Sequence, residues 1–228
     1  MTALVRAGSG SGRVARMAEV SRRLRGRPRA VEADGVGAAE AVFAATARLL
    51  ERESFTDVSV AQILAEASVS RTTFYFYFSS KFTVLAGLLG RAMDDIFETV
   101  QPFLARPAGE GPELALERSI RQVTRVWRRH RLVLRAVNHH WHSEPELRRL
   151  WLEVVERFVA AGADEIDRER AAGLITTAVP SRTLAATLFW STERILYVAG
   201  LGVEAELADE EAAVESLVAI WTGTLYGR

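Results

Sequence analysis

The segment SRTTFYFYFSSK, residues 70–81, gathers polar side chains of types that contact nucleic acids. Polar residues in the first turn of an exposed helix can reach base edges in the major groove, while tyrosine hydroxyls and an ammonium group can hold phosphates. The residues in question are Arg71, Thr72, Thr73, Tyr75, Tyr77 and Lys81. The first three would reach base edges and the last three would hold phosphates. The alternative is a small aromatic core whose tyrosine hydroxyls only reach water.

Five consecutive aromatic residues, 74–78, could alternate along a strand or occupy two faces of a helix. Ser70 is a favourable N-cap residue. At about 100° per residue, Phe74 and Phe78 fall on one helical face and Phe76 falls opposite. A strand would need a pairing partner, and no second strand pattern lies nearby. The spacing therefore predicts a short helix that packs through Phe74 and Phe78.

The residues before this segment predict two more helices. Residues 38–53 carry apolar side chains at the spacing of one buried helical face. Ser59 and Gln62 fit a capping box, which predicts a second helix over residues 60–67. A turn at residues 68–69 then leads into the aromatic helix. This arrangement is a helix-turn-helix with the aromatic segment as its second helix.

Composition limits the class of protein. The 228 residues are 49% apolar, enough for a core, and no apolar run of about 18 residues suggests a membrane span. The absence of cysteine excludes disulfides, thiol catalysis and thiolate metal sites and, with no secretory signal at the start, fits a cytoplasmic protein. No phosphate-binding glycine loop, G-x-S-x-G motif or isolated carboxylate pair occurs, so we predict neither an enzyme nor a cofactor.

The net charge of zero conceals an asymmetry along the chain. Residues 1–30 hold eight arginines and one acidic residue, so they carry a charge of +7 and the remainder carries −7. This stretch lacks apolar periodicity, and we expect a disordered basic arm over residues 1–35. Such an arm either binds DNA phosphates, releasing counterions, or only improves solubility.

A four-residue motif in the arm, Arg25-Gly26-Arg27-Pro28, resembles the core of an AT-hook. An extended segment of this kind can lie in the narrow minor groove of A·T-rich DNA, where the negative potential is enhanced and glycine permits close approach. Arg25 and Arg27 would then read the groove. The alternative is a general contact of these arginines with phosphates.

The rest of the chain predicts a second, larger helical domain over residues 83–228, after a DNA-binding domain over residues 36–82. Its helical patterns are broken by proline and glycine, and Ser143, Ser181 and Asp209 are candidate caps. The patterns cover residues 80–104, 113–130, 132–140, 143–170, 181–198 and 209–226. With the three earlier helices, these make about nine. The predicted fold class is all-α.

The last two predicted helices are apolar on more than one face, so they must be buried on several sides. The residues that give them this character are Leu184, Leu188, Phe189, Trp190, Ile195, Leu196 and Tyr197, then Val214, Leu217, Val218, Ile220, Trp221 and Leu225. Either the core of one chain buries them, or a second copy of the same pair completes a four-helix interface in a homodimer.

Several large aromatic residues lie on different predicted helices whose apolar faces converge. They are Trp127, Trp151, Phe158, Phe189, Trp190 and Trp221. A mostly apolar ligand pocket and plain core packing are both compatible with this set.

Residues 42–89 resemble the DNA-binding domain of TetR-family transcriptional regulators, and the likeness extends more weakly over the whole chain. The residues that carry it are Phe55, Val58-Ser59-Val60, Ile63, Ala67-Ser68-Val69-Ser70, the run from Thr73 to Phe78, and Lys81. The resemblance implies a homodimer that binds palindromic double-stranded operator DNA. It also implies a repressor that a small hydrophobic effector releases from the DNA, by favouring the conformation that binds DNA poorly.

The resemblance assigns roles to further residues. It adds Phe76 to the DNA contacts, at a phosphate, a sugar or a thymine methyl, and it gives Lys81 a phosphate. It places Ser59 where backbone N–H groups at the start of the second helix face a phosphate. Three positions depart from the family pattern: serines replace glycines at Ser54 and Ser68, with some strain where φ is positive, and Phe82 replaces an acid.

Some regulators of this family contain a long hydrophobic ligand tunnel. The positions that match its lining are Val123, Trp127, Trp151, Phe158, Phe189 and Trp221. Phe189 and Thr192 stand where such regulators have polar ligand-binding residues, so the pocket should be more apolar here or differ in specificity. Glu193 follows at once and is a candidate buried acid.

Three histidines flank Trp141, at His139, His140 and His142. Two ligands on one helical turn with a nearby carboxylate, as in H-E-x-x-H, would need a different spacing. We therefore expect solvated or core histidines and predict no metal site.

Overall fold

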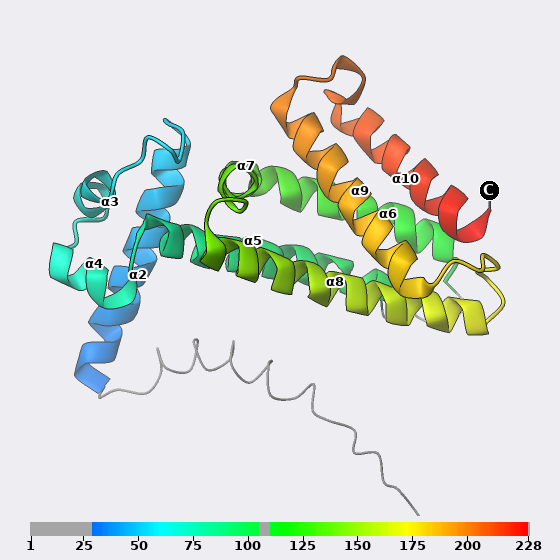
Figure 1. The fold of residues 1–228 in the computed structure, drawn as a ribbon, viewed down its shortest axis with the longest axis horizontal. Helices are drawn as coiled ribbons and strands as arrows, with labels where there is room; N and C mark the ends of the chain where they lie inside the picture. Colours follow the sequence, from blue (N-terminus) through cyan, green and yellow to red (C-terminus); the bar gives the residue numbers. More distant parts are fainter. Residues whose placement is uncertain (1–28, 105–109, 228) are drawn as a thin grey trace, which may run out of the picture.

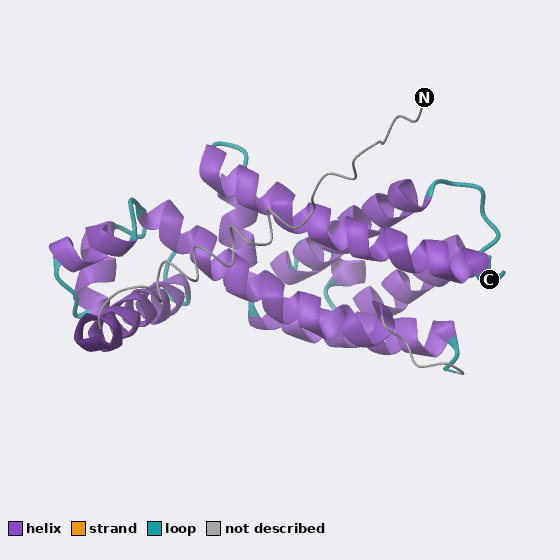
Figure 2. Ribbon diagram, turned by 90° about the horizontal axis from the view of Figure 1, so that it is seen from below, coloured by secondary structure: helices purple, strands orange, loops and turns teal. Residues whose placement is uncertain are grey.

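The computed structural model describes residues 29–104 and 110–227, and within these ranges the protein is helical without strands (Figure 1, Figure 2). The described helices are α2 (Arg29–Leu50), α3 (Val60–Ala67), α4 (Arg71–Tyr77), α5 (Lys81–Leu104), α6 (Pro112–Arg129), α7 (Arg131–His140), α8 (Pro145–Ala171), α9 (Ser181–Leu201), the short 3-10 turn η1 (Ala205–Leu207) and α10 (Glu210–Tyr226). The nine α-helices in this part of the chain match the nine predicted, which confirms the all-α fold class.

Helices α2, α3 and α4 form a small unit at one end of the molecule (Figure 1). Phe74 of α4 and Phe78, the residue after its end, are buried in the same core as Ile63 of α3 and Leu49 of α2. Phe76, on the opposite face of α4, is exposed. The aromatic run is therefore a helix with one buried side, as the spacing predicts.

Both caps predicted in this unit are present. The Ser59 hydroxyl accepts a hydrogen bond from the backbone N–H of Gln62 at 3.2 Å, and the Gln62 side chain accepts one from the Ser59 N–H at 2.7 Å. The Ser70 hydroxyl accepts from the Thr73 N–H at 3.0 Å. These side chains satisfy N–H groups that the first helical turn leaves without partners.

Ser68 ends α3 in the left-handed region, at φ 54° and ψ 38°. It is the one non-glycine residue with positive φ in the ranges that the structure describes. The strain expected at Ser68 is confirmed, whereas Ser54 adopts an ordinary negative φ. The glycine-to-serine difference at position 54 therefore has no cost in backbone conformation.

Helix α2 begins earlier than predicted. Its first residue is Arg29, so residues 29–35, assigned to the disordered arm, are helical. Glycine at positions 35 and 37 costs helix stability but does not end a helix whose other residues favour it. The rest of the arm, including Arg25 and Arg27, lies outside the described residues.

Two of the caps predicted further along the chain are wrong. Helix α8 begins at Pro145 with Glu144 at the N-cap position and without a side-chain cap, and the Ser143 hydroxyl instead donates to the His140 carbonyl at 3.1 Å. Ser181 is the first residue of α9, not its cap. Asp209 caps α10 as predicted, accepting from the Ala212 N–H at 3.4 Å.

Helices α5 and α8 run along the length of the molecule, and α6, α9 and α10 pack with them away from the three-helix unit (Figure 1). The start of α5 is held closely against α2. An added Cβ at Gly87 would lie 2.5 Å from the ring of Phe43, so only glycine allows this approach. Helix α7 contacts α2 as well as α5 and α9, and it therefore joins the two ends of the molecule.

Candidate nucleic-acid interface and interior cavity

The exposed side of α4 presents the residues predicted to contact DNA. Arg71 and Thr72 are exposed, Tyr75 is 49% exposed and Phe76 is 64% exposed. The Arg71 guanidinium lies 5.9 Å from the centre of the Tyr75 ring. These side chains form one polar and aromatic face on the helix that a helix-turn-helix inserts into the major groove.

Thr73 and Tyr77 are only partly exposed. The Thr73 hydroxyl lies 2.8 Å from the Ser70 hydroxyl, so it already belongs to the cap of α4. Tyr77 packs edge-on against Phe76, with ring centres 4.9 Å apart. The predicted contacts therefore fall into two groups: Arg71, Thr72, Tyr75 and Phe76 are exposed, whereas Thr73 and Tyr77 are partly buried and Thr73 belongs in part to the helix cap.

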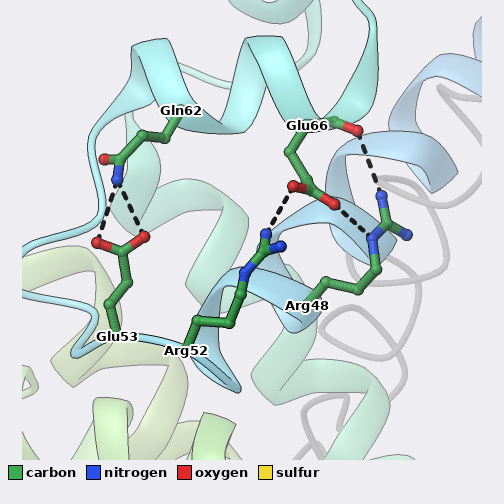
Figure 3. Close-up of polar contacts among 5 residues, drawn as sticks. All are labelled: Arg48, Arg52, Glu53, Gln62 and Glu66. Atoms are coloured by element: carbon green, nitrogen blue, oxygen red, sulfur yellow. Dashed lines mark hydrogen bonds and ion pairs between the residues drawn. The ribbon is translucent and has the colours of Figure 1, made fainter.

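A polar network holds α3 on α2 (Figure 3). Arg48 of α2 and Arg52, just after the end of that helix, contact the two carboxylate oxygens of Glu66 at 2.7 and 2.6 Å. Hydrogen bonds from these two arginines lower the pKa of Glu66. At the other end of α3, the Gln62 amide donates to both carboxylate oxygens of Glu53 at 2.9 and 3.1 Å. These contacts fix the orientation of α3 on α2, the helix that also contacts the recognition helix α4.

Lys81, the single lysine of the chain, has a role that its position in the sequence did not reveal. Its ammonium donates to the backbone carbonyls of Phe55, Thr56 and Val58 at 2.9, 3.0 and 2.7 Å. Desolvation lowers the pKa of this ammonium. An ammonium has three N–H donors, and all three hold the loop before α3, so a phosphate would have to displace a carbonyl. We therefore revise Lys81 from a phosphate ligand to a residue that positions the loop.

The C-terminal end of α7 packs against the same loop. The ring of His140 lies edge-on to Phe55 and Phe82, with centres 5.5 and 5.4 Å apart, and its Nε2 lies 3.4 Å from the Thr56 hydroxyl. Burial is the main cause that lowers the pKa of His140. Phe82, which departs from the family pattern, thus fills the contact between the helix-turn-helix and α7.

A cavity of about 110 Å³ lies between α5, α6, α8, α9 and α10. The predicted ligand residues that line it are Val123, Trp127, Phe158, Phe189, Thr192 and Trp221. Thr192 accepts a hydrogen bond from the Trp221 indole N–H at 2.9 Å, which joins α9 to α10 at the wall.

The prediction that Trp151 lines the cavity is wrong. Its ring is buried against Phe189 and Trp190, with centres 6.2 Å from each. Trp151 therefore supports the wall from behind. Helical periodicity places a residue on the buried face of a helix, but it cannot tell a wall residue from one in the layer behind it.

Three buried glutamates also line the cavity: Glu165 and Glu169 of α8 and Glu193 of α9. Glu165 pairs with Arg168, and Glu169 accepts a hydrogen bond from the Tyr226 hydroxyl at 2.8 Å. Glu193 accepts one from the Asn138 amide of α7, and burial raises its pKa. The apolar neighbours of Glu193 indicated its burial in the sequence, whereas Glu165 and Glu169 stand in a charged stretch that pointed to solvent.

The histidine cluster serves packing. His140 contacts aromatic rings as described, and the His142 ring lies 3.9 Å from that of Trp141. Among the described residues, no group of three or more histidine, cysteine, aspartate or glutamate side chains is arranged to hold a metal ion. Within the same ranges, no helix combines the length and apolar character that a membrane crossing requires.

Helices α9 and α10 are buried on one side only. Leu188, Leu196 and Leu217 lie in the core, whereas Leu201 and Ile220 remain more than a third exposed. The single chain therefore leaves apolar surface on the last two helices uncovered, and the core of one chain does not account for all of their apolar residues.

A helix-turn-helix with an exposed recognition helix, joined to a helical domain around an apolar cavity, defines a class of transcriptional regulators that bind DNA and respond to ligands. Residues 42–87 match the tetR family of bacterial regulatory proteins, and residues 116–227 match the C-terminal domain of the transcriptional regulator EthR. The chain belongs to the TetR family. It is a ligand-responsive, sequence-specific DNA-binding regulator and not an enzyme, and homodimers are typical of the family.

Relatives of known type agree with this assignment. The HTH-type transcriptional regulator EthR of Mycolicibacterium smegmatis is 32% identical over 213 residues, which cover 92% of this chain and 95% of that protein. EthR of Mycobacterium tuberculosis is 32% identical over 187 residues, covering 82% and 86%. The match spans both the DNA-binding end and the cavity domain.

Solved structures share the fold at lower identity. GusR of Salmonella enterica superposes with a TM-score of 0.65 at 18% identity, covering 82% of this chain and 95% of that one. FadR of Thermus thermophilus, a TetR-family repressor solved in complex with lauroyl-CoA, gives a TM-score of 0.58 at 21% identity, with coverage of 82% and 95%. These likenesses support the arrangement of the helices.

Proposed function

We propose that this protein is a cytoplasmic repressor that binds a palindromic operator as a homodimer and leaves it when a small hydrophobic ligand enters the cavity. The observation that supports the DNA-binding part is the exposed face of α4, where the rings of Tyr75 and Phe76 are 49% and 64% exposed. A large apolar ring held in solvent on a recognition helix is suited to a thymine methyl or a sugar.

The proposed DNA contacts fall into two groups. Arg71, Thr72 and Thr73 reach base edges, and Phe76 meets a methyl or a sugar. The hydroxyls of Tyr75 and Tyr77 hold phosphates. The N-terminus of α3, capped by Ser59, offers backbone N–H groups to a further phosphate. Arg25 and Arg27 of the arm add minor-groove or phosphate contacts.

The proposed dimer forms through α9 and α10. Their uncovered apolar side chains, Leu201 and Ile220 among them, are available to a second copy of the same pair. A two-fold axis would place two recognition helices one helical turn of DNA apart, which doubles a contact that is short for a single chain.

The proposed ligand site is the cavity, because most of the side chains in its wall are apolar and come from five helices. A ligand between α5 and α9 can favour one spacing of the two recognition helices over another. It would release DNA to the extent that it binds the two conformations with different affinity.

The test is fluorescence-anisotropy binding to DNA from just upstream of the gene, over a series of salt concentrations and with random DNA as competitor. Tight binding that survives the competitor is expected for a sequence-specific regulator. Binding no tighter than to random DNA, for this segment and for a selected random library, would contradict the proposal. It would favour an architectural DNA-binding protein that acts through its charge.

A further inference from the structure

The cavity wall contains an unusual acceptor. Glu193 is 2% exposed, and its Oε1 accepts the Asn138 amide. Its Oε2 receives no hydrogen bond from the described residues. The nearest cation, the Arg194 guanidinium, lies 3.7 Å from Oε2 on a side chain that is itself 55% exposed. A buried carboxylate oxygen without a donor is rare in folded proteins, because it has given up water without a replacement.

The charged side chains that line the cavity are all acidic, and the arginines that pair with two of them, Arg168 with Glu165 and Arg194 with Glu193, are not among the lining residues. Besides Glu193, the wall includes Glu165 and Glu169, one helical turn apart on α8. Among the described residues that line the cavity, none is lysine, arginine or histidine. The rest of the lining is mainly apolar, with aromatic rings from Trp127, Phe158, Phe189 and Trp221, and its other polar residues are Ser119, Thr124 and Thr192. The cavity therefore combines a low-dielectric interior with a negative potential.

We propose that the ligand of this cavity is a cationic amphiphile, a protonated amine on an apolar tail, whose N–H group donates to Glu193. The proposal rests on the proposed function, which makes this cavity the effector site. The tail would occupy the apolar wall, and the ammonium would supply the donor that Oε2 lacks. An amphiphilic carboxylate is disfavoured, because it would add a fourth acidic group to a lining that contains no basic residue.

The test compares three probes with the same tail: decylamine, 1-decanol and decanoate. Each is titrated into the full-length protein at neutral pH, and binding is measured by calorimetry and by the fluorescence of the wall tryptophans. We expect decylamine to bind about tenfold tighter than decanol or better, the range of a hydrogen bond between charged groups, and decanoate to bind weakest.

The variant Glu193→Gln keeps the size of the side chain and removes its charge. It should lower the affinity for decylamine to that for decanol. Glu215→Gln is the matched control, because Glu215 is an exposed residue of α10 that does not line the cavity. This control should keep the preference of the wild-type protein for the amine.

The comparison of the three probes in the wild-type protein tests the proposal even if Glu193→Gln does not fold. Equal affinity for the three probes, tightest binding of decanoate, or no binding of any of them would overturn the proposal. Decyltrimethylammonium, which has the charge but no N–H group, should bind more weakly than decylamine; equal binding would overturn the hydrogen bond to Glu193. If decylamine binds as expected but leaves operator DNA bound, the ligand class stands and the effector role of the cavity fails.

Discussion

Asn138 and His140 lie two residues apart on α7 and contact different parts of the molecule. Residues with this separation point about 200° apart on a helix. The Asn138 amide donates to Glu193 at the cavity, whereas the His140 ring packs against Phe55 and Phe82 beside the helix-turn-helix. One rigid helix of ten residues therefore contacts both the cavity wall and the loop before α3.

The packing of His140 against this loop predicts that His140→Ala will weaken the coupling between ligand binding and DNA binding. Ligand affinity should stay within about twofold of wild type, while the ligand-induced loss of operator affinity should shrink severalfold, because coupling energies of this kind are typically 1–3 kcal/mol. The measurement is operator titration with and without ligand. His142→Ala, which removes a ring stacked on its neighbour Trp141, is the control. Undiminished release in His140→Ala would show that α7 does not transmit the signal.

Phe76→Ala should separate DNA binding from stability. The exposed ring loses little protein contact, so we expect the free energy of unfolding to change by less than about 0.5 kcal/mol. Operator affinity should fall by about tenfold or more, the scale of a lost contact to a base. Leu114→Ala, at a similarly exposed position on α6, is the control and should bind DNA like wild type. If Phe76→Ala bound the operator with normal affinity, the proposed contact between this face of α4 and DNA would be wrong.

Lys81→Met should destabilise the protein. The substitution leaves three carbonyl groups without their donor, which costs about 1–3 kcal/mol in the free energy of unfolding. Urea unfolding measures the change, with Arg71→Met as a control at an exposed position on α4. A stable Lys81→Met whose DNA binding shows a reduced dependence on salt would instead support a phosphate contact.

Ser68→Gly should stabilise the protein, because glycine adopts the left-handed conformation at φ 54° without the strain of a Cβ. We expect a gain of about 0.5–1 kcal/mol by chemical denaturation. Ser216→Gly places the same change inside α10 and should cost about 1 kcal/mol. A loss of stability in Ser68→Gly would mean that Ser68 makes a compensating contact.

The buried carboxyl group of Glu193 should make the stability of the protein depend on pH. Burial raises its pKa in the folded protein above the ordinary value of 4.5, so the unfolded chain releases this proton first as the pH rises. The contribution of Glu193 to stability is therefore fully present below about pH 4.5 and is lost as the pH rises through the pKa of the folded state. Glutamine cannot ionise, so Glu193→Gln should gain stability relative to wild type over this interval.

Urea unfolding of both proteins between about pH 4 and pH 8 measures this difference. Glu215→Gln is again the control, and its curve should run parallel to that of wild type. A constant difference between Glu193→Gln and wild type across the whole range would show that Glu193 has the same pKa in both states.

Local features of the sequence were sufficient for the helices of the DNA-binding end. Ser59, Gln62 and Ser70 act within one helical turn, so their hydrogen bonds depend on spacing alone. The burial of Phe74 and Phe78 likewise follows from the helical repeat. The serines at 143 and 181 show the limit of such signals, because α8 begins at Pro145, and Pro180 takes the N-cap position of α9, which leaves Ser181 as the first residue of that helix.

Contacts between distant segments decided what the side chains do. The sequence indicates that Lys81 is a phosphate ligand. In the fold, its ammonium instead binds three backbone carbonyls that lie more than twenty residues earlier in the chain. Trp151 and Phe189 have the same apolar character, yet only Phe189 reaches the cavity. Periodicity determines which face of a helix is buried, because it depends on neighbours along the chain; which partner that face meets depends on how the helices cross.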